Sequence, residues 1–298
     1  MYHLFLAMRR VIVTALAFAL AAASAGAQQP SRDAPFACGT AEVGVGEALE
    51  FLATLRLRAG VTQKAPINIP VAFHVVHDGE SGPVTSAQID TLIHNLNWAF
   101  RDTPFSFYLR VTNTVTNSAW SHGCAPGSPN ERKLKRRHAR NPGRFLNIYS
   151  CRPGGKVVGY AYYPFADLGA SRFLDGVVLH PDVLPGGSFD GAAFPHGLLV
   201  AHEVGHYLGL FHTFERSANR GHMPCREPGD FVGDTPTQAG AHFACPAAID
   251  TCPALPGPDD VHNFMNYSDD ECMEHFTPLQ VQRMVDAAAS YRPRLGRR

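Results

Sequence analysis

The segment from His202 to His212 has residue types and spacings suited to holding a metal ion. On a helix, His202 and His206 are four residues apart and project from the same face, as two imidazole ligands of one metal must. Glu203 lies one step round the helix, where its carboxylate could take a proton from a water at the metal. Gly209 permits a left-handed turn that ends the helix and brings His212 back as a third ligand. Three imidazoles leave one coordination position open, which is typical of a catalytic zinc site.

These residues require a helix to carry them, and the sequence predicts one over 194–210, opened by Pro195. A strand within 150–165, ahead of that helix, is expected to offer an edge to which a substrate adds in extended form. Segment 211–276 is rich in Gly, Pro, Asp and Cys without periodicity, so disulfides or ions must stabilise it. The other expected elements are helices over 41–58, 85–100 and 277–291, and strands over 67–76, 105–115, 145–149 and 176–179.

The composition describes a globular chain of one large domain or two small ones. In 298 residues, 26 basic side chains balance 26 acidic ones, and 45% of the residues are hydrophobic against 17% charged. There is enough apolar material for a core, and a disordered polyelectrolyte or a general nucleic-acid binder is disfavoured. The basic run 132–144 is expected to be a solvated face or loop, with contact to an anionic surface as the alternative.

The first 27 residues have the three parts of a secretory signal peptide. Two arginines at 9–10 precede an apolar run over 11–23, and Ala25-Gly26-Ala27 offers a cleavage site; the true start could be Met1 or Met8. The run is too short to span a bilayer, and no later stretch approaches the length that a transmembrane helix needs. We therefore expect a secreted protein with no membrane span, and a monomer.

Export places the seven cysteines in an oxidising compartment, where pairing is the default. Because seven is odd, one is left over, and Cys38 is the natural candidate, since it stands alone before the expected catalytic domain. Four cysteines in the last quarter allow three pairings, and the sequence alone does not choose among them.

The chain resembles the metzincin clan of metallopeptidases, whose zinc motif is followed by a methionine turn, here expected at Met265. More narrowly it resembles the pappalysin family, over about residues 67–292. The motifs that carry the likeness are the loop at 229–236, Cys245-Pro246, Asp250-Thr251-Cys252-Pro253, the turn with Tyr267, and Cys272-Met273 followed by Phe276-Thr277-Pro278-Leu279-Gln280 and Arg283-Met284.

The resemblance implies a set of bonds and roles in the C-terminal half. It implies disulfides Cys225–Cys252 and Cys245–Cys272, and pairing of Cys124 with Cys151 is our own guess. Tyr267 would stabilise the tetrahedral intermediate, with a packed core tyrosine as the alternative. Oxygen ligands for a structural calcium would come from Asp230, Asp234 and Thr235, with an ordinary hydrogen-bonded turn as the alternative.

Cys38 lies in a Cys-Gly-Thr sequence similar to one in the pro-segments of these enzymes. Its thiolate would fill the open position of the zinc and keep a zymogen silent; a disulfide to Cys124 or Cys151 is the competing interpretation. The expected organisation is a signal peptide over 1–27, a pro-segment over 28–64 and a catalytic domain over 65–298.

The expected fold is α+β, a metzincin-like zincin of two lobes. An upper lobe would contain a twisted mixed sheet and two helices, and an irregular, disulfide-stapled lower lobe would end in a helix. The expected activity is that of a zinc-dependent endopeptidase (EC 3.4.24 type) acting on proteins or peptides, with Glu203 as general base. The alternative is a secreted zinc-binding or adhesive domain without turnover. The acidic run Asp269-Asp270-Glu271 could favour a basic residue after the scissile bond.

Overall fold

The computed structural model describes residues 34, 36–58, 66–80, 82–215, 225–226 and 229–297. The expected signal peptide and the end of the expected pro-segment near 59–65 lie outside these residues. The described part of the chain folds around one six-stranded sheet, in the order β1-β5-β6-β4-β2-β3. The strands are β1 (Ala37–Cys38), β2 (Ile67–His77), β3 (Phe105–Thr116), β4 (Leu146–Ser150), β5 (Val157–Ala161) and β6 (Val177–Leu179).

The sheet is mixed because two of its strands, β1 and β5, run against the other four. Strand β5 is antiparallel to β6, and the remaining neighbours are parallel. Strands β2 and β4 are buried almost throughout, as expected of central parallel strands covered on both faces. Helices α2 (Ser86–Ala99) and α5 (Leu199–Tyr207) pack on each other and share a hydrophobic core with the sheet. The expected upper lobe with a mixed sheet and two helices is therefore confirmed.

Shorter helices and a hairpin connect the main strands and helices. Helices α3 (Ser118–Ser121) and α4 (Pro129–His138) follow β3, and the hairpin of β7 (Gly187–Phe189) and β8 (Ala192–Phe194) precedes α5. Two short 3₁₀ helices, η1 (Gly169–Leu174) and η2 (Pro181–Val183), flank β6.

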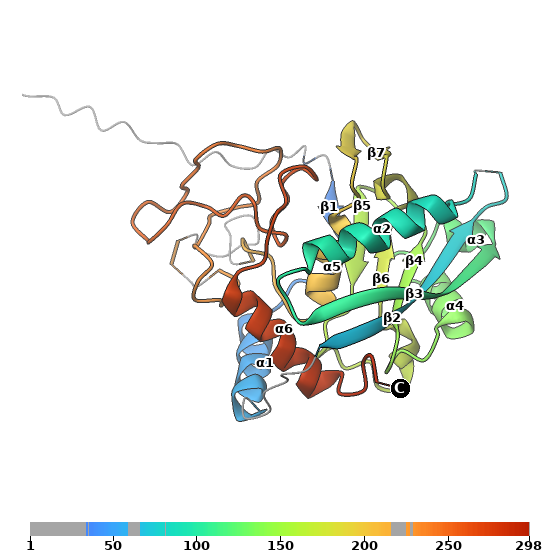
Figure 1. The fold of residues 1–298 in the computed structure, drawn as a ribbon, viewed down its shortest axis with the longest axis horizontal. Helices are drawn as coiled ribbons and strands as arrows, with labels where there is room; N and C mark the ends of the chain where they lie inside the picture. The colour runs from blue at the N-terminus through green and yellow to red at the C-terminus, as the bar shows by residue number, and fades with distance from the viewer. Residues whose placement is uncertain are drawn as a thin grey trace, which may run out of the picture.

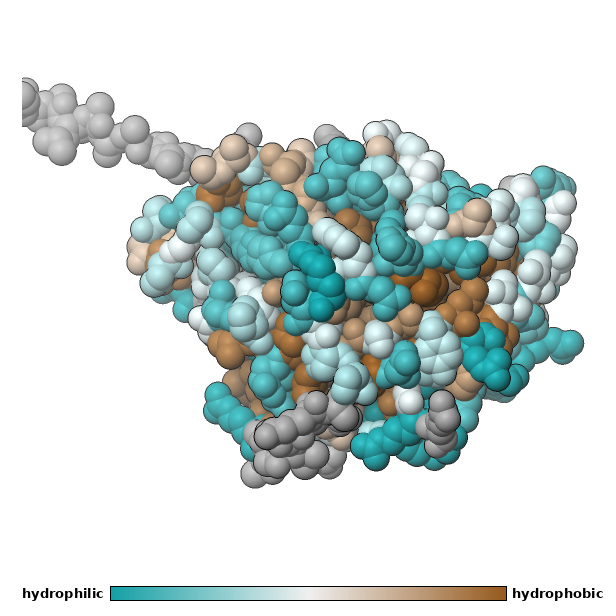
Figure 2. Space-filling view, viewed as in Figure 1, coloured by the Kyte–Doolittle hydropathy of each residue, from teal (hydrophilic) through white to brown (hydrophobic). Residues whose placement is uncertain are grey.

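The C-terminal lobe contains little regular structure before its last helix, α6 (Pro278–Tyr291). Thr277 and Gln280 form a capping box at the start of α6. Helix α1 (Val45–Arg58) packs along α6, and the two lie side by side at the lower left of Figure 1, below the irregular segment. The face shown in Figure 2 mixes hydrophilic residues with smaller hydrophobic patches.

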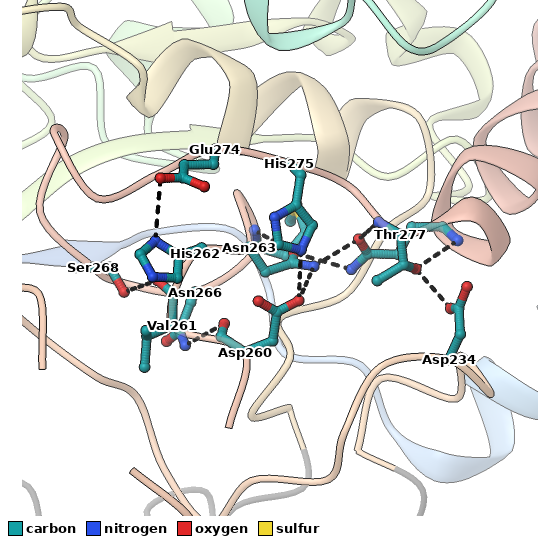
Figure 3. A network of polar contacts seen from close by, with 12 residues as sticks. Asp234, Asp260, Val261, His262, Asn263, Asn266, Ser268, Glu274, His275 and Thr277 are labelled. Carbon is teal, nitrogen blue, oxygen red and sulfur yellow. Dashed lines mark hydrogen bonds and ion pairs between the residues drawn. The ribbon is translucent and has the colours of Figure 1, made fainter. Parts of the chain in front are cut away.

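Buried polar contacts and disulfides take the place of regular structure in this lobe. The Asp260 carboxylate accepts from Asn263 Nδ2 and pairs with His275 Nε2, each at 3.0 Å, and Asn263 also bonds Gln280 of α6 (Figure 3). The disulfides are Cys225–Cys252, Cys245–Cys272 and, in the upper lobe, Cys124–Cys151. These are the three pairs expected from the sequence, and Cys38 has a free thiol.

Sequence-based expectations differ from the structure at several places. The helix expected over 41–58 begins only at Val45. The helix expected over 194–210 begins only at Leu199, because residue 194 belongs to β8 and Gly197 has φ +65°, a left-handed conformation that a helix does not admit. Part of the basic run at 132–144 forms α4, which buries Lys135 on one side and exposes Arg132 and Arg136 on the other. None of the helices in the described ranges is long and apolar enough to cross a membrane.

Candidate metal centre and catalytic site

Three histidine rings meet at the C-terminal end of helix α5. His206 Nε2 lies 3.1 Å from His202 Nε2 and 3.1 Å from His212 Nε2, and all three side chains are buried. Nitrogens bound at about 2.0–2.1 Å by one tetrahedral zinc lie roughly 3.3 Å apart, so the donor set has the size that zinc requires. Gly209 has φ +98° and ends the helix, which lets the chain return to His212. The structure thus brings together the three histidines that the sequence spacing predicts.

Each imidazole is held in one orientation by an acceptor on its other nitrogen. The Nδ1 atoms of His202 and His206 lie 2.7 and 2.8 Å from the carbonyl oxygens of Phe264 and Leu210. His212 Nδ1 lies 3.0 Å from a carboxylate oxygen of Glu215. These contacts place the proton on Nδ1 and leave the Nε2 lone pairs for a metal. Burial and the neighbouring rings keep the pKa of His206 well below its usual value, which favours the neutral imidazole that a metal needs.

Glu203 lies next to this cluster and is fully buried. Burial raises the pKa of its carboxyl to about 8. Strand β5 approaches the carboxylate at Gly159, where an added Cβ would lie 2.8 Å from Glu203 Oε1 and 3.1 Å from its Cγ. Glycine at position 159 therefore makes room for the carboxylate, a role for which the sequence contained no signal.

Residues 37–40 cover the cluster by adding strand β1 to the edge of the sheet. Backbone bonds run from Ala37 N to Lys156 O and from Gly39 N to Gly159 O. The Cys38 side chain belongs to the same cluster as the three histidines, with one potential ligand atom from each of the four residues within 4.8 Å of the others. Burial, and then the Glu203 carboxylate, raise the pKa of the Cys38 thiol well above its usual value.

Thr40 links the covering segment to both β5 and Glu203. Its hydroxyl donates to Glu203 Oε2 at 3.2 Å and accepts from Ala161 N at 2.9 Å. Glu215, which holds His212, also accepts from Val43 N at 3.3 Å. Neither Thr40 nor Glu215 was predicted as a site residue; the only signal was their closeness in sequence to Cys38 and to His212.

Met265 and Tyr267 lie beneath and beside the histidines. An added Cβ at Gly205 would lie 2.4 Å from Met265 Sδ, so the methionine packs directly against the backbone of the active helix. The Tyr267 ring centroid is 5.7 Å from that of His202 and 5.2 Å from that of His212. Its hydroxyl oxygen accepts from Cys38 N at 3.0 Å. Tyr267 is thus close enough to reach a group bound at the histidines.

The three residues predicted to bind calcium lie among hydrogen-bonded contacts near the start of α6. Asp230 Oδ1 accepts from Val232 N at 2.9 Å, as in a simple turn. The Asp234 carboxylate accepts from Thr277 Oγ1 at 2.6 Å and from Leu279 N at 2.9 Å, at the start of α6. Thr235 is buried nearby. Calcium at Asp230, Asp234 and Thr235 stays a prediction.

In the acidic run at 269–271, the central carboxylate is committed to a structural role. Asp270 is buried and accepts from the backbone N–H groups of His196 at 2.6 Å and Gly197 at 3.0 Å, and also from that of Leu198. These donors lie just before α5, where an anion is favoured. Asp269 is exposed and accepts from Ala244 N at 3.2 Å.

The chain matches known proteins in both sequence and fold. The family model for pregnancy-associated plasma protein-A matches residues 131–289, which is more than half of the chain. An extracellular metalloprotease of Neurospora crassa is 35% identical over 269 residues, covering 87% of this chain and 90% of the relative. Another, from Verticillium alfalfae, is 36% identical over 277 residues, covering 88% and 93%.

Two solved structures of Tannerella forsythia mirolysin share the fold. A mutant of promirolysin superposes with a TM-score of 0.69 at 25% identity, covering 83% of this chain and 89% of that one. Mature mirolysin in complex with a cleaved peptide superposes with a TM-score of 0.65 at 27% identity, covering 78% and 96%. The chain therefore belongs to the pappalysin family of metzincin metallopeptidases, the family of pregnancy-associated plasma protein-A.

Proposed function

We propose that the chain is a secreted zinc endopeptidase that hydrolyses peptide bonds in proteins. The observation that carries the proposal is the meeting of the Nε2 atoms of His202, His206 and His212 beside the buried carboxylate of Glu203. Extracellular metalloproteases about 35% identical to this chain support both the activity and the export. We expect the enzyme to act as a monomer.

In this proposal, a zinc ion held by the three histidines supplies Lewis-acid activation of a water and of the scissile carbonyl. Glu203 takes a proton from that water, whose oxygen forms a bond to the carbonyl carbon. Glu203 then gives the proton to the amide nitrogen as the C–N bond breaks, which yields a free amine and a carboxylic acid that loses its remaining proton to solvent. Tyr267 donates its hydroxyl proton in a hydrogen bond to the carbonyl oxygen as negative charge develops there.

Residues 28–64 act as a pro-segment in this proposal. The Cys38 thiol lies beside the three histidines, where it would compete with a water for the metal, and Thr40 donates a hydrogen bond to the Glu203 carboxylate, the proposed proton acceptor. Strand β1 also fills the edge of β5 to which an extended substrate would add. Removal of the segment would free the fourth ligand position, Glu203 and the sheet edge together.

The test is casein cleavage by protein expressed from Gln28 and matured by limited proteolysis, with and without a chelator. Its control is Glu203→Gln, which keeps the side-chain volume and should keep an equal zinc content. We expect chelator-sensitive cleavage that falls by about 10³-fold or more in the variant, because the proton acceptor is lost. Zinc binding without cleavage by the mature protein would instead establish the zinc-binding domain without turnover.

The pro-segment is tested in the full-length chain with Cys38→Ser. We expect this variant to cleave casein without prior proteolysis, while the unchanged chain stays silent. A second readout is the alkylation of Cys38, which should be slow before maturation because the side chain lies against the three histidines. A silent Cys38→Ser chain would mean that the covering strand alone blocks the site.

A further inference from the structure

A pocket beside the C-terminal end of helix α6 is lined by arginines. Its volume is about 260 Å³, and the basic side chains in its wall are Arg172 of η1 together with Arg292 and Arg294, which follow α6. Asp175 is the one acidic side chain among the residues that line it. Pockets for drug-sized ligands usually measure about 300–1,000 Å³, so this one has room for a single ring or a small charged group.

The three arginines differ in how far their charges are already paired. Arg292 is 7% exposed, its guanidinium donates to Asp175 Oδ1 at 2.5 Å, and it lies 3.9 Å from the ring centroid of Tyr207. Its Nε has no hydrogen-bond partner within the described ranges, which is uncommon for a buried polar atom. Arg172 and Arg294 are exposed, and neither forms an ion pair with a described carboxylate. Two positive charges of the pocket thus remain available to an anion.

Helix α4 continues this positive surface. It packs against η1, and the Arg136 guanidinium lies 5.0 Å from the ring centroid of Phe173. Arg132 lies one turn before Arg136 on the same side of α4. The guanidinium of Arg140, just after the helix, lies 5.9 Å from the ring centroid of Phe145. Contacts with ring faces limit the freedom of these side chains, so less entropy is lost when they bind an anion.

The end of the chain is held next to the same surface. Gly296 N donates to Arg144 O at 3.1 Å, and both α4 and the C-terminal end lie at the lower right of Figure 1. An added Cβ at Gly143 would lie 2.9 Å from Arg294 Nη2. The glycine therefore lets the Arg294 guanidinium lie against the backbone at the rim of the pocket.

The dipole of α6 does not account for this arrangement. Cations are favoured at the C-terminal end of any helix, which would explain Arg292 and Arg294 alone. Arg172 and Arg136 belong to η1 and α4, yet they are exposed beside the same pocket. Basic side chains from three elements therefore meet at one place, as a site for several negative charges requires.

The chemistry of this surface favours an acidic sugar chain among the polyanions. Guanidinium groups form paired hydrogen bonds with sulfate and carboxylate groups. None of the exposed large apolar side chains of the described residues lies on α4, η1 or 291–297, so nothing there would stack on bases or enter a membrane. The surface consists of helices and turns and offers no strand edge to an extended acidic peptide.

We propose that this pocket and the arginines beside it bind an acidic polysaccharide through its sulfate or carboxylate groups. One charged group would enter the pocket between Arg172 and Arg294, and the arginines of α4 would contact the groups that follow along the sugar chain. This inference goes beyond the proposed endopeptidase activity, because the site would hold the enzyme at an acidic matrix. The arginine patch is defined here as Arg132, Arg136, Arg140, Arg172 and Arg294.

The first test measures binding of two labelled octasaccharides to the full-length chain by fluorescence anisotropy. Heparin carries sulfate and carboxylate groups, whereas polygalacturonate carries carboxylates alone, so the tighter of the two identifies the group that the patch prefers. We expect the affinity to fall about 10-fold or more between about 0.1 and about 0.3 M NaCl, because each guanidinium displaces counter-ions. Absence of binding by both octasaccharides at the lower salt concentration would overturn the proposal.

The second test removes charge inside and outside the pocket. Arg172→Ala combined with Arg294→Ala should weaken binding of the tighter octasaccharide about 10- to 100-fold, since two charge-assisted contacts are lost. The control is Lys133→Ala combined with Arg137→Ala, which removes the same charge from exposed residues of α4 that do not line the pocket. The control should weaken binding by no more than about 3-fold.

Urea unfolding of both double variants checks that they are as stable as the parent, which is expected because all four side chains are exposed. Equal weakening in the two double variants would show that the net charge, and not the pocket, determines binding. That result would overturn the site.

The third test compares other polyanions on the unchanged chain. Single-stranded DNA, polyglutamate and vesicles of phosphatidylserine and phosphatidylcholine in equal parts should each bind at least about 10-fold more weakly than the tighter octasaccharide. Equal or tighter binding of any of them would assign the patch to that class of partner and overturn the polysaccharide. None of these measurements depends on cleavage, so their failure would leave the proposed endopeptidase untouched, and the reverse also holds.

Discussion

At two positions near the site the residue is a glycine because a neighbouring side chain needs the space of its Cβ atom. Gly159 has no side chain because the Glu203 carboxylate occupies the space where a Cβ would stand. Gly205 gives the same freedom to Met265 on the other side of the helix. Two glycines that carry no chemistry themselves thus make room for the proposed general base and for the methionine that packs on the helix.

We expect Gly159→Ala to lower kcat/KM on casein by about 100-fold, because a displacement of the general base by about 1 Å is costly. The zinc content should not change, since the histidine contacts lie on the other side of Glu203. Gly233→Ala, whose added Cβ would meet no atom closer than 3.6 Å, is the control. Full activity of the Gly159→Ala enzyme would show that Glu203 has room to shift without penalty.

A buried histidine outside the metal site makes stability depend on pH. His74 stacks on Tyr149 at 4.4 Å between centroids, and its Nε2 lies 3.0 Å from Asn147 Oδ1. Burial lowers its pKa from 6.5 to about 4, and the charges of His138 and Lys135 act in the same direction. The folded protein therefore binds this proton less readily than the unfolded chain.

Because the folded pKa is the lower one, the contribution of His74 is fully present above about pH 6.5 and is lost as the pH falls to about 4. The shift corresponds to about 3 kcal/mol of unfolding free energy. Urea unfolding of His74→Gln across this range should show a flatter pH dependence than the unchanged protein. His77→Gln on the same strand is the control, and an unaltered slope in His74→Gln would contradict the assignment.

At the scale of elements, helix α5 depends on a residue far away in sequence for its first turn. Leu198 makes no side-chain cap, and the carboxylate of Asp270 accepts the N–H groups at 196–198 instead. Helix α5 is therefore joined to the C-terminal lobe at its N-terminus and again at His202, which Phe264 O holds.

We expect Asp270→Ala to cost about 2 kcal/mol of unfolding free energy, since three backbone donors, two of them buried, lose their acceptor. The paired control is Asp269→Ala, one residue away but exposed, which should cost less than about 0.5 kcal/mol. Chemical denaturation measures the unfolding free energy of both variants. Equal losses in the two would mean that the cap contributes nothing beyond a surface charge.

Helix α1 follows the covering strand in the chain and packs against the rest of the protein through one buried face. Phe51 packs on Phe165 at 4.5 Å and on Tyr291 at 5.8 Å between ring centroids, and Phe211 lies in the same cluster. Leu49 on the same helix is 53% exposed. Phe51 is therefore a buried contact residue of α1, and Leu49 is an exposed residue of the same helix that can serve as a control.

Phe51→Ala should raise the basal casein cleavage of the full-length chain and the rate of its limited proteolysis. A buried Phe→Ala change costs about 3–5 kcal/mol, enough to populate an open form of the covering segment. Leu49→Ala should leave both rates unchanged. A silent, protease-resistant Phe51→Ala chain would show that strand β1 is held without the helix.

At the scale of the whole molecule, the two lobes are stabilised by different means. The upper lobe has a continuous hydrophobic core between the sheet, α2 and α5. The C-terminal lobe relies on buried polar contacts such as those of Asp260 and on the disulfides Cys225–Cys252 and Cys245–Cys272.

Replacing Cys245 and Cys272 together by alanine should lower the unfolding free energy by about 3.5 kcal/mol, the chain-entropy value for a separation of 27 residues. The pair Cys124 and Cys151 has the same separation but is completely buried, so its removal should cost more because cavities are added. Urea denaturation of both double variants measures which of them loses more unfolding free energy. Casein cleavage checks that the site remains intact in each. A Cys245/Cys272 variant as stable as the parent would show that the polar network alone holds the lobe.

The sequence by itself determined the family and predicted the three histidines and Glu203 as site residues, because these depend on local spacing along one helix and on motifs in a fixed order. It also predicted the main helices and strands from hydrophobic periodicity. It did not predict the start of α5 at Leu199, the helix within 129–138 or the role of Gly159. These depend on contacts between distant segments, such as Asp270 with the backbone at 196–198 and β5 with Glu203. Only the tertiary structure brings such groups together.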